Sequence, residues 1–515
     1  RPPSAYPWLI QRMEYRWMRG NDMRKRVFFA LVFLMILQPA AWPQQTGETG
    51  FEDNPAMPGG VKGERIRSLI DTVNSGDAGR IRRFLSEECT EEFRTMAPME
   101  THINVFLGLL RETGGIEFHG IRTYIPGRKG ETVVIVKDKN LGNWLGLTLR
   151  FAGGAGFLVS GAAFGDARTP TDVVEPSLSA DEIVGQTKAV VRRLIEKDSF
   201  SGALLIARGD DILLTMAGGK ASRAFHVLNN VDTKFNLGSM NKMFTSTAVM
   251  RLVEKGKLSL DDPIGKYIDE SWLPGSVTEK IIIRHLLTHT SGLGSYFNET
   301  FVKSSRDLFR KLDDYKPLIK DDKPAFEPGS RYRYSNTGMF LLGVIIEKTT
   351  GEDYFEHIRK AIYAPAGMTD TDCYEMDHPV ENLAIGYSPD PQSPSGWRNN
   401  LYTHVIKGGP AGGGFSTVRD LHKFALALLG GKCVAPGTLK IMWTDYMGAG
   451  YGYGFYVDRG SAGTAVGHSG GFDGINSTLN IYVDSGYIVA VMSNVDRGAV
   501  PLARKIGSLL GRLKK

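Results

Sequence analysis

The segment that most restricts how this chain can fold is the apolar run that starts at Phe235 and reads FNLGSMNKMF. Apolar residues continue around the predicted helix as far as Val253, and Gly256 is suited to cap its C-terminus. A helix that is apolar on all sides has to be buried inside a domain. The fold must therefore be built around this helix, which carries Ser239 and Lys242 at its start.

Ser239 and Lys242 have the spacing of a catalytic pair. Residues three apart share one face of a helix, so the amine can reach the hydroxyl. A serine becomes a nucleophile when a base takes its proton, and burial can lower the pKa of a lysine enough for that role. The N-terminus of the helix favours a developing oxyanion. The alternative is a solvent-facing Ser and Lys on an ordinary amphipathic helix, which the motif alone does not exclude.

A second group of chemically useful side chains is Tyr334-Ser335-Asn336. A tyrosine beside a lysine can share a proton-shuttle role, and an asparagine amide can orient both a substrate carbonyl and the lysine. The alternative reading is a turn that leads into a helix over Met339–Glu347.

The third group is the glycine-rich run Gly467–Gly471, which reads GHSGG. Its glycines let a substrate lie close to the backbone, and the Gly471 N–H can complete an oxyanion hole with that of Ser239. The alternative is a glycine-rich entry to a hairpin. The run also matches the nucleophile elbow of α/β-hydrolases, but that fold places its histidine after the serine, and the last histidine here is His468.

Taken in order, the Ser-Met-Asn-Lys, Tyr-Ser-Asn and His-Ser-Gly motifs resemble those of the serine β-lactamase and penicillin-binding-protein superfamily. The resemblance is to the branch of class C β-lactamases, D-stereospecific peptidases and family VIII carboxylesterases, and it covers about residues 185–515. Three further stretches support it: Leu258–Pro263, Leu286–Leu293 and Gly409–Thr417. The fold that it implies is an α/β sandwich, with an antiparallel sheet flanked by helices, beside a helical lobe.

The resemblance also implies residue roles. Ser239 would be the nucleophile, Lys242 its base and Tyr334 the proton shuttle to the leaving group. The implied substrate-binding and oxyanion residues are Asn336, His468, Ser469, Gly470 and Gly471. His468 stands where many β-lactamases have a lysine that anchors the carboxylate of the antibiotic, and a neutral imidazole does this less well.

We therefore expect a serine hydrolase that cleaves an ester or amide through an acyl-enzyme. Carboxylester hydrolysis ranks first, cleavage of D-amino-acid peptides second and β-lactam hydrolysis third. The alternative is a penicillin-binding or cell-wall-sensing module without turnover. The expected partners are small esters, amides or peptides.

The sequence also predicts a domain order. Residues 1–45 form a leader, in which basic, apolar and small residues over 23–41 have the pattern of an export signal rather than a membrane anchor. The predicted location is periplasmic or extracellular, with weak membrane association if the signal is not cleaved. After a flexible segment at 46–62, residues 63–165 resemble an NTF2-like cone by pattern. A linker at 166–186 precedes the hydrolase domain at 187–515.

Composition excludes other classes of function. The net charge is +6, and five of these charges lie in the first 26 residues, so the rest of the chain gives no sign of a nucleic-acid partner. Three widely spaced cysteines exclude a disulfide framework and a cysteine-based zinc site. His285 and His289 are four residues apart, but no third ligand is in view, so we expect no metal and no cofactor. The sequence leaves the oligomeric state open.

Overall fold

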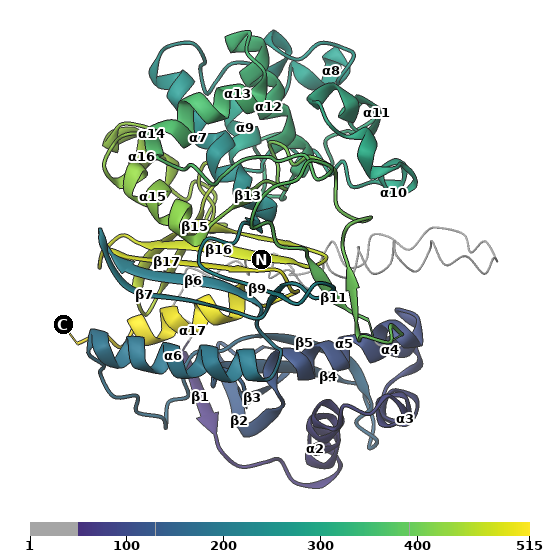
Figure 1. Ribbon diagram of the computed structural model, residues 1–515. Helices are drawn as coiled ribbons and strands as arrows, with labels where there is room; N and C mark the ends of the chain where they lie inside the picture. The colour runs from purple at the N-terminus through teal and green to yellow at the C-terminus, as the bar shows by residue number, and fades with distance from the viewer. Residues whose placement is uncertain (1–49, 129, 391, 515) are drawn as a thin grey trace. The chain divides into compact units, whose positions relative to one another are not determined.

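The computed structural model describes residues 50–128, 130–390 and 392–514 (Figure 1). The predicted leader and export signal lie outside these residues. Among the helices described, none combines the length and the apolar character that crossing a bilayer requires.

The N-terminal part of the described chain is a five-stranded antiparallel sheet with four helices. The strands are β1 (Gly50–Asn54), β2 (Ile116–Ile125), β3 (Thr132–Asp138), β4 (Trp144–Phe151) and β5 (Val159–Asp166), paired in that order. The helices are α2 (Gly60–Ser75), α3 (Ala78–Glu88), α4 (Glu91–Thr95) and α5 (Met99–Thr113). Ile66, Leu85 and Leu147 are fully buried where helices and sheet meet. The NTF2-like assignment of this part stays a prediction.

The prediction of a flexible segment at 46–62 is wrong for its described residues. Residues 50–54 form β1, which pairs with β2, and α2 begins at Gly60. Asp53 forms a 2.8 Å ion pair with Arg122 of β2, and each side chain is only 1% exposed. The Arg122 guanidinium also lies 3.7 Å from the Phe51 ring centroid. These partners are about 70 positions away in the sequence, so local composition gave no sign of them.

The predicted linker at 166–186 is also too long. Helix α6 (Ala180–Glu196) starts inside it, because the Ser179 side chain accepts a hydrogen bond from the Glu182 N–H and the Glu182 carboxylate accepts one from the Ser179 N–H. This capping box is a helix-start signal that is visible in the sequence. The predicted boundary at residue 187 therefore falls inside α6, about two helical turns after its start.

The hydrolase domain has a six-stranded antiparallel sheet at its centre. The strands are β6 (Gly202–Arg208), β7 (Asp211–Gly218), β14 (Tyr456–Gly460), β15 (Gly463–Phe472), β16 (Ile475–Tyr482) and β17 (Tyr487–Ser493). Their order in the sheet is β14-β15-β16-β17-β6-β7, so the two ends of the domain's sequence meet where β17 pairs with β6.

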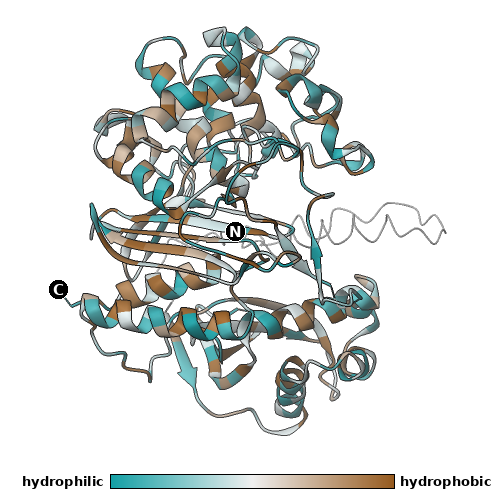
Figure 2. Ribbon diagram, viewed as in Figure 1, coloured by the Kyte–Doolittle hydropathy of each residue, from teal (hydrophilic) through white to brown (hydrophobic). Residues whose placement is uncertain are grey.

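Helices cover both faces of this sheet (Figure 1). Helices α6 and α17 (Val500–Leu510) pack on one face, against Leu204, Ile206 and Val489. The other face meets the helical lobe, whose core includes Leu205, Ala490 and the central helix α7 (Asn241–Glu254). Hydrophobic residues, coloured brown, recur along the strands of this sheet (Figure 2). This is the predicted sandwich with a helical lobe.

The remaining elements are short or belong to the lobe. The helices are α8 (Gly275–Thr278), α9 (Ile283–Leu287), α10 (Glu299–Lys303), α11 (Lys316–Ile319), α12 (Asn336–Thr350), α13 (Tyr354–Ile358), α14 (Ala364–Ala366), α15 (Val418–Leu429) and α16 (Pro436–Met442). Single turns are η1 (Gly238–Met240), η2 (Ile264–Lys266), η3 (Arg306–Leu308), η4 (Leu312–Tyr315) and η5 (Arg359–Tyr363). The short strands are β8 (Lys220–Ser222), β9 (Val227–Leu228), β10 (Phe235–Asn236), β11 (Tyr387–Pro389), β12 (Trp397–Asn399) and β13 (Phe415–Ser416).

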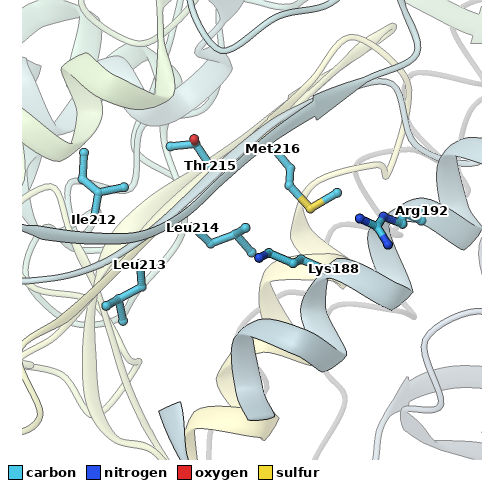
Figure 3. A pocket seen from close by; sticks show the side chains of 7 residues that line it. All are labelled: Lys188, Arg192, Ile212, Leu213, Leu214, Thr215 and Met216. Atoms are coloured by element: carbon cyan, nitrogen blue, oxygen red, sulfur yellow. The ribbon is translucent and has the colours of Figure 1, made fainter. Parts of the chain in front are cut away.

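An open groove of about 350 Å³ runs along β7, the edge strand at the far side of the sheet from β14 (Figure 3). Lys188 and Arg192 of α6 line it together with Leu214 and Met216. Leu213 is an extra residue in β7, because Ile206 and Ala207 of β6 pair with residues on either side of it. Cations and a bulge are common protection against unwanted pairing at a sheet edge. We therefore interpret the groove as a protected sheet edge rather than as a catalytic site.

Candidate active site

Ser239 is the point at which a buried segment reaches solvent. Every residue from 233 to 250 is buried except Ser239, which is partly exposed. It lies in η1, between β10 and α7. The preceding Gly238 has φ +50°, and a Cβ there would lie 2.9 Å from the Gly471 nitrogen. The turn that presents Ser239 therefore needs glycine before it.

Lys242 is fully buried beside Ser239. Its Nζ lies 3.1 Å from Ser239 Oγ and 2.9 Å from Asn336 Oδ1, and it also bonds the Ala411 carbonyl. Burial holds the pKa of Lys242 well below its usual value of 10.5. A neutral amine has two N–H groups and one lone pair. Because the amide oxygen of Asn336 and the carbonyl of Ala411 can only accept, they take both N–H groups and leave the lone pair for the Ser239 hydroxyl.

Tyr334 is the third side chain at this site, and it lies almost 100 residues further along the chain than Ser239. Lys242 Nζ lies 4.9 Å from the centroid of the Tyr334 ring, and the Ser239 side chain is close enough to the Tyr334 hydroxyl to act on the pKa of the phenol. Burial raises the pKa of the Tyr334 phenol well above 10, with a smaller contribution from Tyr456 in the same direction. The phenol is therefore protonated at neutral pH and can donate a proton.

Asn336 is fixed by the start of α12. Ser335 caps this helix by accepting a hydrogen bond from the Gly338 N–H, so the Tyr-Ser-Asn motif is the turn into a helix as well as part of the site. The Asn336 amide spans two groups: Oδ1 accepts from Lys242, and Nδ2 donates to Ser295 Oγ at 3.1 Å. The structure thus brings Ser239, Lys242, Tyr334 and Asn336 together, across almost 100 residues of sequence.

The glycine-rich end of β15 packs directly on the Ser239 turn. A Cβ on Gly470 would lie 1.9 Å from the Leu237 carbonyl oxygen and 2.8 Å from the Ser239 nitrogen. Pairing of β14 with β15 stops at Gly467, so the strand beyond it is free of β14. Ser469 and Gly471 are partly exposed there. The backbone of β15 therefore borders the same opening as Ser239.

His468, which we predicted to bind the substrate, is held inside the protein. The side chain is buried, at 2% exposure. Nδ1 donates to the Ser469 carbonyl at 2.5 Å, and Nε2 accepts from the Tyr451 hydroxyl at 3.1 Å. Burial and the nearby Lys242 lower the pKa of His468 to about 3. Both ring nitrogens are engaged inside the protein, so the imidazole is neutral and offers no cation to a substrate.

The sequence did not indicate three of these contacts. The Ala411 carbonyl is a backbone group, and no residue type marks such a role. Ser295 belongs to no motif that we recognised. Tyr451 begins the aromatic run Tyr451–Phe455, and its position 17 residues before His468 was the available signal.

The two histidines that were weighed as zinc ligands do not share a helix face. Helix α9 ends at Leu287, and His289 lies beyond it with φ +57°. His289 Nδ1 accepts a hydrogen bond from the Ser335 N–H at 3.2 Å.

The structure also brings Glu375, Asp377 and His378 within ligand distance of one another. Arg310 already pairs with both carboxylates, at 2.5 Å and 2.6 Å. We interpret this cluster as a surface ion-pair network.

The fold and this site define a class of protein: a serine hydrolase built as a helix-flanked antiparallel sheet, with the serine in the turn that leads into the central helix. The chain belongs to the Beta-lactamase family, whose family model matches residues 187–510.

Individual relatives agree with this assignment. The chain is 30% identical over 316 residues to penicillin-binding protein 4* of Bacillus subtilis, covering 58% of this chain and 69% of that protein. It is 29% identical over 244 residues to esterase EstB of Burkholderia gladioli, covering 45% of this chain and 62% of the esterase. A penicillin-binding protein of Bacillus halodurans has a similar crystal structure, with a TM-score of 0.57, 30% identity, and coverage of 62% of this chain and 98% of that one.

Proposed function

We propose that this protein is a carboxylester hydrolase that forms an acyl-enzyme on Ser239. The observation that carries the proposal is the set of partners around Lys242 Nζ. Two acceptors bind its two N–H groups, and the remaining position faces Ser239, the only residue of 233–250 that is not buried. This is the arrangement that a lysine base requires.

In the acylation step, Lys242 takes the Ser239 proton while Oγ attacks the ester carbonyl. The negative charge that develops on the carbonyl oxygen meets the backbone N–H groups of Ser239 and Gly471, which the packing of β15 on the Ser239 turn brings to one opening. As the C–O bond breaks, Tyr334 donates its proton to the leaving alkoxide and recovers one from the Lys242 ammonium. The products of this step are the alcohol and an ester on Ser239.

The directions of the two pKa shifts assign these roles. Burial lowers the pKa of Lys242, which favours the free amine that a base requires. Burial raises the pKa of Tyr334, which favours the protonated phenol that an acid requires. The reverse assignment would place an ammonium on Lys242 and a phenolate on Tyr334, and burial disfavours both charged forms. In deacylation, water replaces the alcohol, the same pair accepts its proton, and the acid product leaves with Ser239 restored.

The neutral state of His468 favours an ester substrate over a substrate that carries a carboxylate beside the scissile bond. A β-lactam presents such a carboxylate, and so does the C-terminal residue of a peptide. A neutral imidazole whose nitrogens already bond Ser469 and Tyr451 supplies no charge to bind it. The similarity to an esterase points in the same direction.

Cleavage of D-amino-acid amides or peptides is the second candidate and β-lactam hydrolysis the third. A module that binds without turnover is the alternative from another class. A pure binder does not need an acid and a base with oppositely shifted pKa values around one serine, which favours an enzyme. We further propose that the protein acts in the periplasm or outside the cell, on the basis of the signal pattern at 23–41.

Two esters that differ only in the leaving group test the substrate class. Phenyl acetate and 3-acetoxybenzoate share the acetyl group, and only the second carries a carboxylate on its leaving group. We expect kcat/KM for phenyl acetate to exceed that for 3-acetoxybenzoate by at least about tenfold, because nothing offsets the desolvation of the carboxylate. A preference for 3-acetoxybenzoate would contradict the role given to His468 and move the carboxylate-bearing substrates to first place.

A further inference from the structure

His289 has two unfavourable features that the proposed mechanism does not explain. It is completely buried, and it adopts φ +57°, a left-handed conformation that is uncommon for residues with a side chain. Within the part of the chain that the structure describes, no acceptor lies within hydrogen-bond reach of its Nε2. Backbone strain and an orphaned buried polar atom persist where the surrounding structure imposes them, and they gather at functional sites.

The contacts of His289 show that its closest neighbour in the site is Tyr334. Its ring centroid lies 4.3 Å from that of Tyr334 and 4.6 Å from that of Tyr451. Its Nδ1 accepts the N–H of Ser335, the residue that follows Tyr334. His289 therefore holds Tyr334 in two ways, by packing against the phenol ring and by bonding the adjacent backbone.

The protonation state of His289 is consistent with this contact. Nδ1 can accept from the Ser335 N–H only when it carries no proton, so the remaining proton lies on Nε2. Burial lowers the pKa of His289 well below 6.5, and Lys242 and His468 act in the same direction. The ring is therefore neutral at neutral pH, and the acceptor is always present.

We infer that His289 is a positioning residue for Tyr334, which keeps the phenol beside Ser239 so that it can protonate the leaving group. The unfavourable backbone angle places the ring between Tyr334 and Tyr451. This inference rests on the proposed function, because it assigns His289 through the role given to Tyr334.

A double-mutant cycle of His289→Asn with Tyr334→Phe tests the inference. Asparagine tolerates the left-handed conformation and offers a carbonyl to the Ser335 N–H, so mainly the ring is lost. With phenyl acetate, we expect His289→Asn to lower kcat by about 10²-fold through misplacement of Tyr334, with KM changed less than about threefold. In the Tyr334→Phe background, the same substitution should lower kcat by less than about threefold, because the group that it positions is already gone.

His285→Asn is the matched control. His285 lies four residues earlier, is partly exposed, and interacts with the Ile282 backbone rather than with the site. Its kcat should stay within about threefold of that of the wild type. Should His289→Asn unfold, His289→Phe supplies a second cycle: it keeps a ring but removes the acceptor for Ser335, and its loss of kcat should likewise shrink in the Tyr334→Phe background.

Two results would overturn the inference: a wild-type kcat for His289→Asn, or an equal fold-loss with and without the Tyr334 hydroxyl. Failure of the proposed function has a different signature. In that case the wild-type protein would show no hydrolysis that depends on Ser239. The double-mutant cycle would then have no wild-type rate with which to compare the variants.

Discussion

Replacing Ser239 by alanine is expected to lower kcat/KM for phenyl acetate by at least about 10⁴-fold, because the acyl-enzyme can no longer form. The substitution removes one partly exposed oxygen and leaves the buried packing of α7 intact. The melting temperature should therefore remain within a few degrees of that of the wild type. Kinetics and thermal unfolding of the same preparation measure both quantities.

Ser246→Ala is the control for this substitution. Ser246 lies on α7, the helix that follows the Ser239 turn. It is fully buried, and its Oγ has no hydrogen-bond partner among the described residues. Removing it costs no hydrogen bond, so the activity should remain near that of the wild type. Retention of full activity by Ser239→Ala would remove the nucleophile from the proposal.

Replacing Lys242 by methionine should lower kcat/KM by about 10² to 10⁴-fold, the range expected for loss of a general base. Methionine has a similar volume, so the packing is retained while the amine is lost. Lys234→Met is the matched control, because Lys234 is also buried but pairs with Asp370 at 2.9 Å. It should keep activity within about threefold. An equal loss in both variants would indicate a general effect of removing a buried lysine.

The pH dependence of the wild type tests the same role. A lysine with the ordinary pKa of 10.5 would give a rate that rises about tenfold per pH unit between about pH 7 and about pH 9, as more amine becomes neutral. Because burial lowers the pKa of Lys242, the rise should level off well below pH 10.5. The rate should fall on the acid side of that point, where the amine becomes protonated. A tenfold rise per unit that continues as far as pH 10.5 would contradict the lowered pKa.

The sequence predicted the parts of the site that depend on local geometry. The three-residue spacing of Ser239 and Lys242 is set by one helical turn, and the surrounding apolar run indicated its burial. The order of the motifs predicted that Tyr334 and Asn336 belong to the site. Their contact with Lys242, however, depends on how α12 packs against α7. That packing joins residues 94 apart and has no local signature.

Other parts of the molecule could not be predicted, each for its own physical reason. The Ala411 carbonyl accepts from Lys242 as a backbone group, which any residue could supply. No sequence motif indicated that Nε2 of His468 would accept a hydrogen bond from the Tyr451 hydroxyl. Strand β1 exists through the buried pair of Asp53 and Arg122, which only the paired sheet brings together. The start of α6, by contrast, could have been predicted from its Ser179–Glu182 capping box.

The most direct test of the central claim is mass spectrometry of the protein after rapid acid quenching during turnover of a p-nitrophenyl ester. The account predicts that a peptide containing Ser239 gains the mass of the acyl group, and that the adduct disappears once the substrate is consumed. Turnover with the acyl group found on another residue, or with no adduct at any quench time while a burst of p-nitrophenol equal to the enzyme concentration is released, would contradict the assignment of Ser239 as the nucleophile.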